Sequence, residues 1–79
     1  MKKILLMGLT ASATEAGIRS WLSGYGQVNH VDLVHEGDAT APVAVIEMDI
    51  TDGQVFLIVS RISGYWHDGS LVSARLLNH

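Results

Sequence analysis

Three residues in the first half of the chain are of the types that bind metal ions. His30, Asp32 and His35 lie close together in sequence, and imidazole and carboxylate groups are zinc ligands. His30 and Asp32 are two positions apart, so they would share one face of a strand. Two ligands do not make a site, and exposed polar residues on a half-solvated strand explain the same pattern. We therefore expect no metal site.

The other candidates for catalysis are weaker. His67 and Asp68 are adjacent in a segment typical of a turn, where aspartate favours the backbone conformation. The segment Gly24–Gly26 lacks the rest of a dinucleotide-binding fingerprint and follows a predicted helix, whereas that fingerprint precedes one. The chain has no cysteine, which excludes a thiolate metal site, a cysteine nucleophile and a disulfide. Because no serine, histidine and acid form a recognisable group, we expect no enzymatic activity and no cofactor.

The composition is that of a small domain with few charges. The 79 residues fit one domain, and 16% of them are charged, against about 25% in average domains. The net charge is −3 and the five basic residues are scattered, so no basic stripe follows a phosphate backbone. The longest apolar runs, Ile4–Leu9 and Val55–Val59, are too short to span a bilayer. We expect a single domain, residues 1–79, outside the membrane and with apolar surface.

The N-terminal segment allows two interpretations. Two lysines, the apolar run Ile4–Leu9 and the small residues Ala11–Ala13 follow one another in the order of a secretory signal. The apolar run is shorter than the ~7–15 residues of a signal's hydrophobic region, so we predict a strand. On this interpretation we expect a cytoplasmic protein.

Hydrophobic periodicity predicts two helices and four strands. Apolar residues spaced by three and four positions mark the helices, and apolar or alternating runs bounded by turn residues mark the strands. The predicted elements are a strand at 3–9, a helix at 14–23, strands at 28–34 and 43–48, a helix from Thr51 to Gly64 and a strand at 70–77. His35–Ala41 is predicted to be a turn, and Tyr65–Gly69 a loop.

Capping residues mark where the two helices begin. Before the first helix, Ser12 with Glu15 forms a capping-box pair, and Thr14 is an equally good cap. Before the second helix, Thr51 and Gln54 form another capping box. These residues support the predicted helix starts and leave the first cap open between two positions.

The predicted order βαββαβ builds an α+β, ferredoxin-like sandwich: a four-stranded antiparallel sheet with two helices on one face. The other face of the sheet stays open. The first and third strands are apolar at consecutive positions, although a strand covered on one side normally alternates. One apolar set is expected to face the helices (Ile4, Leu6, Ala44, Ile46 and Met48), and a second set to face outward in mid-sheet (Leu5, Met7, Val43 and Val45).

Residues at many separated positions match one known family. Gly8-Leu9 stands where the family has Asn-Leu, Thr14-Glu15 begins its first helix, Ile18, Leu22 and Tyr25-Gly26 occupy its apolar positions, Ile62-Ser63-Gly64 matches its Leu-Asn-Gly signature, and Asp68-Gly69 its last turn. On these residues the chain resembles the RNA recognition motif (RRM) family over essentially its whole length. The resemblance implies the sandwich predicted above. It supports the fold more than the activity, because the matching positions are mostly core and turns.

The resemblance also indicates where RNA would bind. RRMs stack the bases of single-stranded RNA on aromatic residues of their two central strands. In this sequence Leu5, Val43 and Val45 stand at the three stacking positions, with Ala41 replacing a basic residue and Pro42 a glycine. Each base stacked on an aromatic ring contributes ~1–3 kcal/mol, so we expect weaker binding than the family's usual mode provides.

Two hypotheses from different functional classes follow. The first is an RRM-like nucleic-acid-binding protein with weak or atypical binding of single-stranded RNA. Its candidate residues are the sheet face Leu5, Met7, His30, Val43, Val45 and Arg75, and the auxiliary residues Lys2, Lys3, Tyr65 and Trp66. The second is a protein-interaction or self-association module that uses the apolar open face, with His30, Asp32, Glu47, Ser73 and Arg75 as its polar rim. Phe56 and Leu57 offer a smaller surface, unless Phe56 belongs to the core.

The auxiliary residues also have structural explanations. Lysines near an N-terminus are usually solvated. Arg75 has Glu47 or Asp32 as potential cross-strand partners. Trp66 is large enough to cover the second helix.

Overall fold

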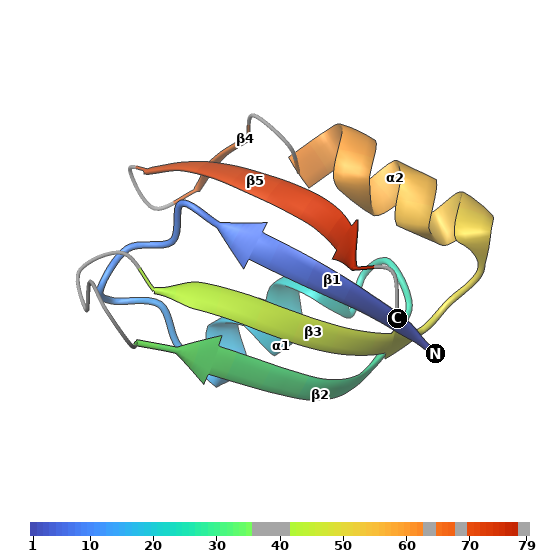
Figure 1. The fold of residues 1–79 in the computed structure, drawn as a ribbon, viewed down its shortest axis with the longest axis horizontal. Helices are drawn as coiled ribbons and strands as arrows, with labels where there is room; N and C mark the ends of the chain where they lie inside the picture. The colour runs from blue at the N-terminus through green and yellow to red at the C-terminus, as the bar shows by residue number, and fades with distance from the viewer. Residues whose placement is uncertain (36–41, 63–64, 68–69, 78–79) are drawn as a thin grey trace.

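The computed structural model describes residues 1–35, 42–62, 65–67 and 70–77, with the backbone alone for residues 65–67 and 70. The described residues form five strands and two helices in the order β1-α1-β2-β3-α2-β4-β5 (Figure 1). The strands are β1 (Lys2–Met7), β2 (Gln27–Val34), β3 (Val43–Asp49), β4 (Tyr65–His67) and β5 (Ser70–Leu77), and the helices are α1 (Glu15–Leu22) and α2 (Asp52–Ile62). The turn predicted at His35–Ala41 lies outside the described residues apart from His35, and the turn predicted at Asp68-Gly69 lies wholly outside them.

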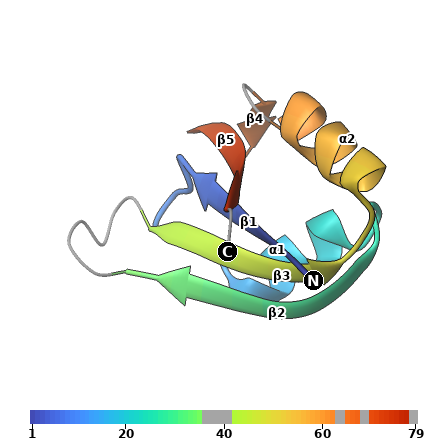
Figure 2. The same cartoon turned by 45° about the vertical axis from the view of Figure 1, so that its right-hand side comes forward.

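Strand β1 lies at the centre of an antiparallel sheet whose order is β2-β3-β1-β5-β4. It pairs with β3 on one side and with β5 on the other. Helices α1 and α2 lie on the same side of this sheet, as the two views in Figures 1 and 2 show. The four longer strands and the two helices have the predicted βαββαβ order. The predicted ferredoxin-like sandwich with a four-stranded antiparallel sheet is therefore confirmed.

The segment Tyr65–His67 is a strand, so the loop predicted there is wrong. It forms β4 at the edge of the sheet, where Tyr65 pairs with Val72 and His67 with Ser70. Aromatic residues favour strands. Two residues, Asp-Gly, separate His67 from Ser70, and this dipeptide is a strong hairpin signal. That signal marked the turn, but the strand before it was not predicted.

Both helices begin at predicted caps. The N–H of Gly17 donates to Thr14 Oγ1 at 3.0 Å, which makes Thr14 the N-cap of α1. At α2 the N–H of Gln54 donates to Thr51 Oγ1, and the N–H of Thr51 donates to Gln54 Oε1 at 2.9 Å. The predicted capping box is therefore present. Gln54 Nε2 also donates to the carbonyl oxygen of Tyr25, which ties the start of α2 to the segment after α1.

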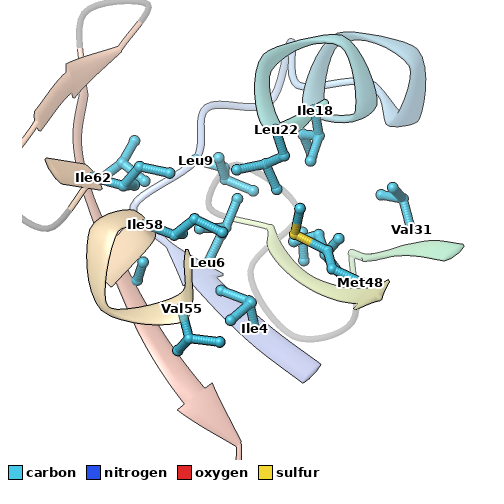
Figure 3. Packing of buried hydrophobic residues seen from close by; sticks show 14 residues of the cluster. Ile4, Leu6, Leu9, Ile18, Leu22, Val31, Met48, Val55, Ile58 and Ile62 are labelled. Carbon is cyan, nitrogen blue, oxygen red and sulfur yellow. The ribbon is translucent and has the colours of Figure 1, made fainter. Parts of the chain in front are cut away.

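The core lies between the sheet and the helices, and Figure 3 shows its side chains. Alternate residues of the central strands point into it and are fully buried: Ile4 and Leu6 of β1, and Ala44, Ile46 and Met48 of β3. The helices contribute Ile18, Leu22, Val55, Ile58 and Ile62. Burying one such aliphatic side chain contributes about 1.5–3 kcal/mol. The core therefore fixes which face of each strand is turned inward, and this confirms the predicted inward set.

Strand β1 ends two residues earlier than predicted because the chain turns at Gly8. Gly8 has a φ of +83°, a left-handed conformation that residues with a Cβ rarely adopt. A Cβ at this position would also overlap the backbone oxygen of Leu71. Leu9 consequently leaves the strand and enters the core, where it is 4% exposed.

Candidate functional site

Three rows of side chains cross the open face of the sheet. Residues opposite each other in an antiparallel ladder lie on the same face, so the strand register defines the rows. Across β2, β3, β1 and β5 the rows are His30, Glu47, Lys3 and Leu77; then Asp32, Val45, Leu5 and Arg75; then Val34, Val43, Met7 and Ser73. Figure 1 views the sheet with α1 behind it, so this face is toward the reader. All six residues predicted for the sheet face lie in these rows.

The centre of the open face is aliphatic. Leu5 and Val45 are opposite each other, and Met7 and Val43 lie one row further along. All four are half-buried although the helices are on the other side of the sheet. No phenylalanine, tyrosine or tryptophan stands in the three rows. The described side chains of these three rows therefore form an apolar surface without an aromatic ring.

Charges of both signs flank this apolar centre in the first and middle rows. In the first row Glu47 is directly opposite Lys3. In the middle row Asp32 and Arg75 stand at opposite ends, three strand spacings or about 14 Å apart. Within the described ranges Arg75 forms no ion pair with Glu47 or Asp32, so neither of the two possible pairings is present. These three rows carry two basic and two acidic side chains, and the exposed Asp49 at the end of β3 lies on the same face, so the described face has no excess of positive charge.

A β-bulge turns His30 toward the open face. The register of β2 shifts between Val28, which pairs with Met48, and His30, which pairs with Glu47. The extra residue, Asn29, reverses the inward and outward alternation of the strand. Val28 therefore packs against the core while His30, two residues later, is exposed on the other face. The three-residue spacing from Val28 to Val31 was the sequence signal for this bulge.

The two N-terminal lysines lie on opposite faces of β1. Lys2 is opposite the buried Met48, and its Nζ forms an ion pair with Asp52 at the start of α2. The Lys2 ammonium group lowers the pKa of the Asp52 carboxyl, first by a hydrogen bond and then by its charge. Lys3 lies on the open face. Only Lys3 of this predicted auxiliary pair therefore adjoins the candidate site.

Strand β4 extends the sheet beside the first three residues of β5. Trp66 pairs with Leu71, and Leu71 alternates with Val72 so that it shares the face of Ser73. Leu71 is 51% exposed and continues the apolar surface. Sequence reasoning missed it, although its alternation with Ser73 and Arg75 was visible. The side chains of Tyr65 and Trp66, including the predicted packing of Trp66 on the second helix, lie outside the described residues.

Comparison with known proteins identifies the fold. No protein-family model matches the sequence, and no curated protein matches it. Among solved structures, the RRM3 of Pes4 is similar with a TM-score of 0.85 at 14% identity, covering 100% of this chain and 94% of that one. RNA Binding Protein PG1 has a TM-score of 0.85 at 12% identity, covering 100% and 96%. The Rna15 RRM with bound RNA (GU) has a TM-score of 0.75 at 17% identity, covering 92% and 79%.

The chain has an RRM-like fold. In this RRM-like domain Leu5 lies on β1, and Val43 and Val45 lie on β3, which are the two central strands of the four-stranded sheet. All three side chains on these central strands are aliphatic.

The helix side of the RRM-like domain carries fewer candidate features. Phe56 on α2 is 71% exposed and Leu57 is 44% exposed, so Phe56 does not belong to the core. A shallow hollow of about 240 Å³ lies beside Trp21, Tyr25 and Arg61. Among the described residues no three histidine, aspartate or glutamate side chains form a metal-binding group. Within the same ranges, neither helix has the length and apolarity that a membrane crossing requires.

Proposed function

We propose that this RRM-like domain binds single-stranded RNA weakly, through the open face of its sheet. The observation that carries the proposal is the position of Leu5, Val43 and Val45, which form a flat apolar surface on the two central strands. RRMs receive RNA bases on this part of their sheet. One solved structure of similar fold is the Rna15 RRM with bound RNA (GU).

The aliphatic surface determines the expected strength of binding. Leu5 and Val45 can exclude water from the face of a base, but they lack the ring on which a base stacks. Each aromatic platform contributes ~1–3 kcal/mol, and the three aliphatic replacements forgo this contribution. We therefore expect weak binding with little preference among bases.

The charges determine where the RNA backbone would run. The basic residues Lys3 and Arg75 lie on the adjacent strands β1 and β5, whereas the acidic residues Glu47 and Asp32 lie on β3 and β2. RNA phosphates should therefore be attracted to the half of the face formed by β1 and β5 and repelled from the half formed by β2 and β3. With about two phosphate contacts, log K should fall with log salt with a slope of about −1.4 for a single strand.

Amide chemical shifts test this proposal directly. A random pool of single-stranded RNA is added at low salt to a dilute solution of the protein. We expect it to change the amide chemical shifts of Leu5, Met7 and Val45. Arg75→Ala should weaken binding several-fold. Arg61→Ala is the matched control, because Arg61 is an exposed arginine in the last turn of α2, away from the sheet face. Absent shifts, shifts confined to the helices, or equal losses in the two variants would contradict the proposal.

Self-association or protein binding through the same face is the second candidate function. The observation that favours it is the uncovered aliphatic centre, Leu5, Met7, Val43 and Val45, surrounded by charged residues. An apolar centre with a polar rim is the usual anatomy of a protein interface.

A further inference from the structure

The charges of the open face are arranged so that the face complements itself. In the middle row, Asp32 and Arg75 stand at the two ends, with Val45 and Leu5 between them. In the neighbouring row the central pair is Glu47 on β3 and Lys3 on β1. The acidic residues therefore occupy the half of the face formed by β2 and β3, and the basic residues occupy the half formed by β1 and β5.

We infer that a second copy of this chain docks on the open face. The two copies are related by a twofold axis that lies between them, above the open face, and runs parallel to the strands midway between β1 and β3. This inference specifies the geometry of the second candidate function and rests on it. The axis places β3 over β1 of the second copy, and β2 over β5. Val45 then meets Leu5, Asp32 meets Arg75, and Glu47 meets Lys3 across the interface. Each contact occurs twice, because a twofold interface is self-complementary.

The charge pattern selects this axis over the other twofold axis that could run between the two faces, which is perpendicular to the strands. An axis perpendicular to the strands would place Asp32 on Asp32 and Arg75 on Arg75 of the second copy. It would also exchange the outer rows, so that the charged Glu47 would face Val43. Like charges would repel, and a charge would lose its water against an aliphatic side chain without a partner. The axis parallel to the strands avoids both costs and keeps the two sheets aligned, as stacked sheets commonly are.

The size of the face indicates a weak dimer. Strand spacings of about 4.8 Å and row spacings of about 7 Å make the grid of outer residues about 14 Å on each side. With its side chains the face buries on the order of 400 Å² per copy, or about 800 Å² in total, below the roughly 1,200 Å² of stable interfaces. We expect association in the high micromolar to millimolar range. RNA and a second copy would use the same residues and therefore compete.

Exchange of charges at Asp32 and Arg75 tests the geometry. Within one copy these side chains are exposed and stand at opposite ends of their row, so their substitution removes no ion pair. In Asp32→Lys the new ammonium group would face Arg75 of the second copy, and in Arg75→Glu the new carboxylate would face Asp32. Each variant alone should therefore dimerise less than the unmodified chain. An equimolar mixture restores opposite charges at both contacts, so the mixed dimer should be at least about tenfold tighter than either variant alone.

Sedimentation equilibrium over a wide concentration range measures these states, and amide spectra check that each variant is folded. A concentration-dependent mass that is lost in both variants and recovered in their mixture supports the inference. A monomeric mass up to millimolar protein, or a dimer that neither variant weakens, overturns it. Amide chemical shifts of Leu5 and Val45 that change on addition of the RNA pool but not on dilution overturn the inference. In that case RNA, and not a second copy, occupies the open face. Because RNA binding is measured on dilute monomer, its failure leaves the dimer test unaffected.

Discussion

Leu5 on β1 and Val45 on β3 lie directly opposite each other at the centre of the open sheet face. Both side chains are half-buried, and the helices cover the opposite face of the same strands. In an RRM-like fold these positions are the ones at which aromatic rings receive bases. The pair therefore separates two parts of the proposed RNA binding: the fold provides the position of the surface, and the residue types on it set the expected affinity.

Replacement of Val45 by phenylalanine should strengthen RNA binding. A ring at this position gives one base a stacking surface of ~1–3 kcal/mol, which is about 5- to 100-fold in affinity. Fluorescence anisotropy with a labelled random single-stranded RNA at low salt measures the change. Leu57→Phe adds a ring at an exposed position of α2 and is the matched control. An equal gain in both variants would contradict a site on the sheet face.

Lys3→Ala and Lys2→Ala should differ in their effect on RNA binding. Lys3 lies on the open face, so its loss should weaken binding and reduce the magnitude of the salt slope by about 0.7, the contribution of one phosphate contact to a single strand. Lys2 is paired with Asp52 on the helix side, so its loss should leave the slope unchanged. Titrations at several salt concentrations make the comparison. A larger change in slope for Lys2→Ala would contradict the assignment of faces.

Much of the fold could be predicted because its signals are local. Apolar spacing gave the helices, Thr51 with Gln54 gave the start of α2, and the doubly apolar strands gave the two faces of β1 and β3. The exceptions are points at which a distant segment decides the local conformation. Gly8 ends β1 where its backbone closely approaches Leu71, and Tyr65–His67 becomes a strand because β5 is available beside it.

The candidate site was harder to predict because it depends on strand register. Alternation placed Leu5 and Val45 on the open face, but it did not show which residues stand opposite each other. Arg75 is next to Leu5, so its distance from the acids of β2 and β3 emerges only when the strands are aligned. The order of acids and bases across the sheet, which the dimer inference uses, has no counterpart in the linear sequence.

Gly8→Ala should destabilise the fold. The φ of +83° is unfavourable for alanine, and the new Cβ would overlap the backbone oxygen of Leu71, so we expect a loss of at least about 1–3 kcal/mol in the free energy of unfolding. Urea denaturation measures it. Gly53→Ala, in the first turn of α2 with room for a Cβ, is the control and should be neutral or stabilising by up to about 1 kcal/mol. Equal stability of the Gly8→Ala variant and the unmodified chain would contradict the strained turn.

Asp52→Asn should change how the stability of the domain responds to acid. The Lys2 ammonium group lowers the pKa of Asp52 below its ordinary value of 3.8 in the folded chain, while the unfolded chain keeps the ordinary value. The ion pair therefore stabilises the fold above pH 3.8, and this contribution is lost as the pH falls through the lower, folded pKa. Urea denaturation of the unmodified chain and of Asp52→Asn should show a difference in stability at neutral pH that disappears in this acidic range.

The effect at Asp52 should be small and sensitive to salt, because the carboxyl side chain is 89% exposed. Asp49→Asn is the matched control, since Asp49 is an exposed carboxylate at the end of β3 that forms no ion pair within the described part of the chain. Lys2→Met removes the partner charge and should give the same pH response as Asp52→Asn. A stability difference between Asp52→Asn and the unmodified chain that stays constant from neutral pH through the acidic range would contradict the pairing of Lys2 with Asp52. That outcome would also return Lys2 to the group of free cations that can contribute to RNA binding.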